Sequence, residues 1–91
     1  MHTRSAKLTF HIPYAMSLKD KRQVSRSLID KTRRKFNVSV SEVDTLDVHQ
    51  TLTVGISLVS GSVSHAEASL DAVLRFMEQA AQAELLEIEQ C

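Results

Sequence analysis

One segment of this 91-residue chain, residues 17 to 36, holds eight of its eleven Lys and Arg residues. They are Lys19, Lys21, Arg22, Arg26, Lys31, Arg33, Arg34 and Lys35. The segment also contains Asp20 and Asp30, so its net charge is +6, whereas residues 37 to 91 carry nine acids and one base, Arg75. The formal net charge of zero therefore hides a dipolar molecule. A concentrated cationic segment of this kind is suited to binding an anion.

On a predicted helix these cations form two groups, one near the first turn and one in the last turns. Cations in the last turns, such as Arg33 and Arg34, complement the negative end of the helix dipole, at roughly 0.3–1 kcal/mol each, and need no function. Lys19, Lys21 and Arg22 lie near the first turn, where the dipole disfavours positive charge by a similar amount. A cationic helix start with free N–H groups is suited to a phosphate or a carboxylate.

A basic stripe also follows from helical geometry. At 3.6 residues per turn, Lys19, Arg22, Arg26 and Arg33 project within about 60° of one another. The candidate anion-binding or RNA-binding residues are therefore Lys19, Lys21, Arg22, Arg26 and Arg33. If the stripe binds an anion, RNA phosphate is the leading candidate, held by salt-dependent and sequence-poor contacts. The alternative is a solvated helix face with no partner.

Other residues that could do chemistry show no recognisable arrangement. The four histidines, His2, His11, His49 and His65, lack metal-ligand spacing, and Cys91 is the single cysteine. There is no G-x-S-x-G and no Gly-rich phosphate loop. The sequence thus predicts no catalytic residues, no metal, no cofactor and no enzymatic activity. A small hydrolase of phosphate esters or acyl phosphates is the least favoured alternative, because the link Tyr14 to Met16 has no glycine to let backbone N–H groups wrap an anion.

The basic segment belongs to a regular series of elements. Residues 6 to 14 alternate apolar and polar, which indicates a half-buried strand ending near Pro13. Ser17 is a suitable N-cap for the helix over 17–36, and Asn37 is suited to a left-handed cap at its end. Strands follow over 38–43 and 48–59, the second of them expected to be central.

The C-terminal third of the chain repeats the helix-strand pattern. Ser64 to Glu67 form an S-x-x-E capping box for a second helix that runs to about Gln82. A last strand begins at Ala83, with Leu86 and Ile88 on one side and Leu85, Glu87 and Glu89 on the other. The order βαββαβ in one domain, residues 1–91, predicts an α+β ferredoxin-like sandwich of four antiparallel strands with both helices on one face.

The outer face of that sheet offers a second type of interaction. Its predicted members are polar and rich in Ser and Thr: Lys7, Thr9, His11, Ser39, Ser41, Thr51, Thr53, Ser57, Glu87 and Glu89. It has no aromatic for base stacking, since Phe10 and Tyr14 fall on the apolar side and are expected in the core. The face could instead dock a second copy of the chain, so a homodimeric protein-interaction module is the alternative function.

Amino-acid composition indicates the class of protein and the cellular compartment. With 43% hydrophobic and 24% charged residues, the chain has the composition of a globular protein. No apolar run approaches the roughly 18–20 residues of a membrane span, and the first residues lack the apolar core of a secretory signal. A single cysteine fits a reducing compartment. These features predict a cytoplasmic protein with no membrane partner.

Several segments together resemble the YlxP-like family of small bacterial proteins. They are His11-Ile12-Pro13, the run from Ser17 to Arg22, the run from Phe36 to Asp44, His65-Ala66-Glu67 and the run from Val73 to Phe76. The resemblance covers nearly the whole chain and implies a ferredoxin-like fold. It implies no activity, because the function of the family is unknown. Genes of the family often lie beside translation-initiation and ribosome-maturation genes, which suggests a ribosome-related role.

Overall fold

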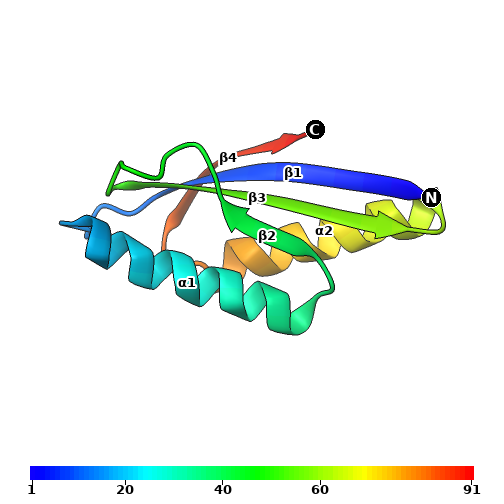
Figure 1. Cartoon of the computed structure of the whole chain (residues 1–91), viewed down its shortest axis with the longest axis horizontal. Helices are drawn as coiled ribbons and strands as arrows, with labels where there is room; N and C mark the ends of the chain where they lie inside the picture. The colour runs from blue at the N-terminus through cyan, green and yellow to red at the C-terminus, as the bar shows by residue number, and fades with distance from the viewer.

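The computed structural model describes the whole chain, residues 1–91, as one sheet covered by two helices. The elements in order are β1 (His2–His11), α1 (Leu18–Lys35), β2 (Ser39–Glu42), β3 (Thr51–Ser60), α2 (Val63–Ala80) and β4 (Glu84–Gln90). The strands are antiparallel in the order β2-β3-β1-β4, which places β3 centrally beside β1. Both helices lie below the same face of the sheet (Figure 1). The predicted ferredoxin-like fold is confirmed.

The core lies between the sheet and the helices and is built from aliphatic side chains. Alternate residues of β1, such as Leu8 and Phe10, are fully buried, as are Leu52 and Val54 of β3. Val73 and Met77 of α2 meet them from below. Tyr14 departs from the prediction, because the residue is 54% exposed and its hydroxyl donates to the carbonyl of Gln82. Phe10 is therefore the aromatic that fills the core.

Helix α1 begins where the sequence predicts and ends differently. Ser17 is the N-cap, with its Oγ accepting from the N–H of Asp20 at 3.2 Å, while the Asp20 carboxylate accepts from the N–H of Met16 at 3.0 Å. The C-cap is Phe36 in an extended conformation, so the expected left-handed cap at Asn37 is wrong. The chain leaves the helix directly toward β2, and an extended residue aims it there.

Helix α2 begins two residues earlier than its capping box indicates. The N-cap is Ser62, whose Oγ accepts from the N–H of His65 at 3.1 Å. Ser64 already lies inside the helix, so the prediction of Ser64 as the cap is wrong. The short break after β3 leaves only Gly61 before the cap, and the earlier serine is the one free to take the extended cap conformation.

A β-bulge in β4 places Leu85 on the opposite face of the sheet from the predicted one. The register against β1 shifts between Thr9 and Phe10, so that Thr9 opposes Glu87 while Phe10 opposes Leu85. Leu86 is the extra residue. Leu85 consequently packs on the core side instead of sharing the outer face with Glu87, and Leu86 remains 57% exposed.

Candidate functional site

The basic stripe of α1, defined as Lys19, Arg22, Arg26 and Arg33, is exposed as predicted. Helix α1 turns its other side, with Val24, Leu28 and Thr32, into the protein. No carboxylate lies within salt-bridge distance of any of the four stripe residues, although the structure contains five salt bridges elsewhere. The stripe is therefore a row of cations whose charge is not neutralised within the chain.

Lys21 is separated from this stripe by burial. Only 1% of Lys21 is exposed, and its Nζ donates to the carbonyls of Thr45 and Val48. The same Nζ lies 2.7 Å from Oε2 of Glu42, so the two opposite charges form a salt bridge. The Lys21 ammonium faces inward, where its charge is already compensated. An anion arriving at the stripe therefore meets four basic side chains, not five.

Position within the helix could have identified Lys21 as buried. It lies three residues before Val24 and seven before Leu28, which is the spacing of the apolar side. A lysine on that side requires a partner, because a buried ammonium without one is very costly. The partner, Glu42, lies at the end of β2 and was not identifiable by spacing alone. Glu42 is further held by Ser25, whose Oγ donates to Oε1 at 3.2 Å.

Arg33 joins the stripe to the edge of the sheet. Its Nη2 donates to the carbonyl of Val40 at 2.8 Å. That carbonyl points away from β3 on the free edge of β2, so Arg33 occupies a hydrogen-bonding site that another strand could use. The remaining N–H groups of Arg33 stay available to an external anion.

The loop between β2 and β3 covers part of the outer sheet face. Thr45 Oγ1 donates to Thr53 Oγ1 at 2.9 Å, and Thr53 is only 3% exposed. A Cβ added at Gly55 would lie 3.4 Å from Val43, an ordinary van der Waals distance, so the loop lies directly against the sheet at this position. Of the predicted outer face, Thr53 is therefore not accessible. Beside the loop remains a hollow of about 430 Å³, lined by serines and by Lys7, Asp44 and Gly55.

Lys7 and Asp44 join this loop to β1. Lys7 Nζ lies 2.8 Å from Asp44 Oδ2 and 3.7 Å from Glu89 Oε2. The hydrogen bond to Asp44, followed by the negative charges of Asp44 and Glu89, raises the pKa of Lys7. Asp44 has a φ of 61°, a left-handed conformation that aspartate tolerates better than most residues. The outer face thus carries its one lysine in a compensated state.

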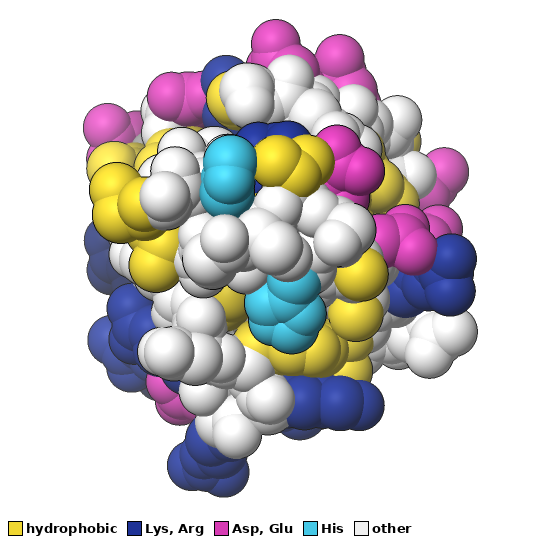
Figure 2. Space-filling view, turned by 90° about the vertical axis from the view of Figure 1, so that its right-hand side faces the viewer, with side chains coloured by type: hydrophobic (Ala, Val, Ile, Leu, Met, Phe, Trp, Pro, Cys, Tyr) yellow, Lys and Arg dark blue, Asp and Glu magenta, His cyan; other side chains and the backbone are white.

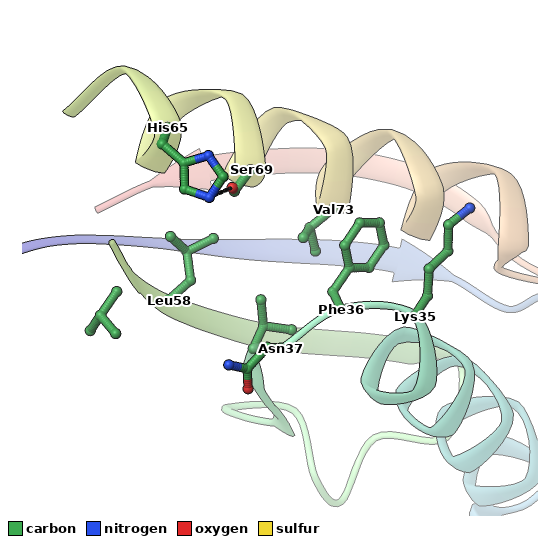
Figure 3. A pocket seen from close by; sticks show the side chains of 9 residues that line it. Lys35, Phe36, Asn37, Leu58, His65, Ser69 and Val73 are labelled. Atoms are coloured by element: carbon green, nitrogen blue, oxygen red, sulfur yellow. Dashed lines mark hydrogen bonds between the residues drawn. The ribbon is translucent and has the colours of Figure 1, made fainter. Parts of the chain in front are cut away.

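A smaller hollow lies where the end of α1 meets the start of α2. Its volume is about 290 Å³, and Phe36, Leu58 and Val73 form much of its wall (Figure 3). His65 and Ser69 of α2 border it with their side chains 3.5 Å apart, too long for a strong hydrogen bond. The Lys35 amine is directed away from them, over the Phe76 ring at 4.8 Å. These groups do not converge on one point as a catalytic set would.

Comparison with known proteins identifies the family. The family model described as "protein of unknown function (DUF503)" matches residues 4–90. The chain belongs to the DUF503 family. The uncharacterized protein YlxP of Bacillus subtilis (strain 168) is 41% identical over 64 residues, covering 70% of each protein. This confirms the predicted YlxP-like membership.

A solved structure supports the fold of this DUF503 protein. A de novo designed protein with a ferredoxin fold superimposes with a TM-score of 0.58 at 15% identity, covering all of this chain and 84% of the design. At that identity the likeness concerns the fold alone.

Charge on the surface of this DUF503 protein is segregated by element. At the end that carries the N-terminus, Lys and Arg lie mainly at the left and bottom, with a further group at the right, whereas Asp and Glu lie mainly along the top and right (Figure 2). No group of three or more His, Cys, Asp or Glu comes together as metal ligands would. Neither helix has the length and apolarity needed to cross a bilayer. The basic stripe of α1 is therefore the most distinct chemical feature of the surface.

Proposed function

We propose that this DUF503 protein is a non-enzymatic cytoplasmic binding module that contacts ribosomal RNA, within a ribosomal subunit, through the basic stripe. The observation that carries the proposal is that Lys19, Arg22, Arg26 and Arg33 line one exposed side of α1 without a salt-bridge partner, whereas Arg4, Lys7, Lys21 and Arg75 each have at least one. Cations left without intramolecular partners are the groups that phosphates can engage at no internal cost.

The geometry of α1 suits a phosphate backbone. The stripe residues are spaced along one straight helix, so they can follow a chain of phosphates instead of surrounding a single ion. The outer sheet face has no aromatic side chain for base stacking, which favours sequence-poor recognition of the backbone. Lys21 takes no part, because its ammonium is buried against Glu42. Its effect on binding is expected to be indirect.

Binding to purified ribosomal subunits and to ribosomal RNA across a salt series tests the proposal. With four phosphate contacts, the logarithm of the binding constant should fall against the logarithm of salt concentration with a slope of about −3. Arg22→Glu/Arg26→Glu should abolish binding or make this slope shallower by about 1.5. A stripe that is only a solvated face would show no binding even at low salt.

A matched control separates the stripe from net charge. Lys31→Glu/Arg34→Glu makes the same change in charge on the other exposed side of α1, where neither residue has a salt bridge. We expect this variant to retain most of the binding, with thermal melts confirming that both variants fold. Equal loss in the two variants would instead indicate a general charge effect. A stable dimer with normal stripe variants would favour the homodimeric module.

A further inference from the structure

The two free edges of the sheet differ in how they are closed. The β2 edge is covered, because Arg33 bonds the Val40 carbonyl and the Lys21–Glu42 pair lies at its end. The β4 edge, formed by Glu84–Gln90, has no such side chain across it. An open edge presents unpaired N–H and C=O groups to any chain that can extend the sheet.

The register shows which groups of β4 are free. The N–H of Cys91 bonds the carbonyl of Ser5, and bonding alternates along an antiparallel pair. Glu87 and Glu89 therefore turn their backbone groups toward β1, while Ile88 and Gln90 turn theirs outward. An incoming strand would pair with Ile88 and Gln90.

The side chains at this edge have a definite chemistry on each face. Glu87 and Glu89 lie opposite Thr9 and Lys7, so they stand on the outer face of the sheet. Ile88 lies opposite the buried Leu8, on the helix side, and remains 39% exposed. The edge is thus acidic on the outer face and apolar on the helix side, which suits a strand with alternating basic and apolar residues.

Helix α2 places two further acids below the edge, each already paired with an arginine. A hollow of about 240 Å³ lies beside Gln90 and is bordered by Glu67 and Asp71 of α2, together with Arg4. Residues 63 to 91 carry six acids and a single basic residue, Arg75. Arg4 and Arg75 each neutralise one of the α2 acids. The acids of β4 are compensated only by the 3.7 Å contact of Glu89 with Lys7.

These same acids disfavour a second copy of the chain as the occupant. Antiparallel pairing of two β4 strands about Ile88 would place Glu87 opposite Glu89, and pairing about Glu89 would place that residue opposite itself. Like charges directly opposite each other destabilise a strand pair. We propose that the β4 edge binds an extended protein segment with alternating basic and apolar residues, which adds as a fifth strand.

A synthetic hexapeptide of alternating lysine and valine is the probe, and the matched control is its glutamate–valine counterpart. NMR titration of the labelled protein should show the amide signals of Ile88 and Gln90 shifting with the lysine peptide and not with the glutamate peptide. Glu87→Gln/Glu89→Gln should weaken binding about five- to tenfold, as expected for two exposed ion pairs.

A backbone variant tests strand addition separately from charge. Ile88→Pro removes an N–H that faces outward, which an edge strand tolerates, and should abolish peptide binding while the melting curve stays cooperative. RNA binding through α1 should be unchanged, so this test is independent of the proposed function. Binding of both peptides alike, shifts confined to other elements, or a concentration-dependent dimer that the same proline abolishes would each overturn the proposal.

Discussion

At the scale of single residues, Lys21 shows how a side chain of binding type can serve the fold. Its ammonium holds the carbonyls of Thr45 and Val48 and neutralises Glu42, whose side chain is only 13% exposed. These contacts join the start of α1 to the loop that follows β2. The loop has no regular structure between Val43 and Gln50, so its position depends on such contacts.

Replacing Lys21 therefore tests a structural role. We expect Lys21→Met to lower the free energy of unfolding by about 3 kcal/mol, because it leaves the Glu42 carboxylate partly buried without its counter-charge. Lys19→Met, on the exposed side two residues earlier, should change stability by less than about 0.5 kcal/mol. Urea denaturation of the two variants gives both values. Equal costs would contradict the inward role of Lys21.

Lys7 gives a pH dependence whose sign follows from its contacts. The hydrogen bond to Asp44 raises the pKa of Lys7 above its usual 10.5. Below pH 10.5 the amine is charged in both the folded and the unfolded chain, so its stabilising contribution is fully present. That contribution is lost as pH rises through the folded pKa, because the unfolded chain gives up the proton first.

The prediction is a melting temperature that falls more steeply above about pH 10.5 in the native protein than in Lys7→Gln. Thermal melts followed by circular dichroism from pH 8 to pH 12 measure this difference. The difference in melting temperature between the two proteins should be constant below about pH 10.5 and should shrink as pH rises above it. A gap that keeps its size through pH 12 would show that the Lys7–Asp44 contact does not contribute.

At the scale of elements, the start of α2 offers two serines that are almost equally suitable as the N-cap by sequence. Ser62 accepts from the N–H of His65, whereas Ser64 lies within the helix. Ser62→Ala should lower the free energy of unfolding by about 1 kcal/mol, and so lower the melting temperature by about 4–8 °C. Ser64→Ala should have an effect below about 0.5 kcal/mol. A larger loss of stability in Ser64→Ala than in Ser62→Ala would instead support Ser64 as the N-cap.

The bulge in β4 explains a second difference at this scale. Strict alternation places Leu85 with Glu87 and Glu89, but the extra residue between Glu87 and Leu85 returns Leu85 to the core side. The bulge leaves Leu86 exposed near Ile88 and so creates the apolar part of the β4 edge. A bulge depends on the partner strand, which local periodicity does not describe.

At the scale of the whole molecule, a small core must hold a sheet and two helices together. Phe10 is fully buried and is among the largest side chains of that core. Phe10→Ala should lower the free energy of unfolding by about 4 kcal/mol, a large part of the 5–15 kcal/mol typical of a protein of this size. Chemical denaturation measures the loss.

The comparison variant is Tyr14→Ala, which alters the other aromatic that alternation assigns to the core. Its side chain is half exposed, so we expect a cost below about 2 kcal/mol, largely from the lost hydrogen bond to Gln82. If the two variants were equally destabilised, Tyr14 would contribute to the core despite its exposure.

The sequence by itself determined the order of the elements, the fold class and the segregation of charge. Each depends on local information: the period of two in β1, the period of 3.6 in the helices and the count of charges in each segment. Even the exposure of Arg22 and Arg26 follows from the side of α1 on which they lie. These features are set by neighbours in the chain, so periodicity identifies them.

Tertiary structure alone decided which group compensates Lys21, what holds Arg33 and which strand edge is open. Lys21 forms a buried salt bridge with Glu42, which is 21 residues away, and Arg33 donates a hydrogen bond to Val40 of another element. The β4 edge is open because nothing distant in sequence packs across it. Such outcomes depend on contacts between different elements, and local pattern does not show which elements meet.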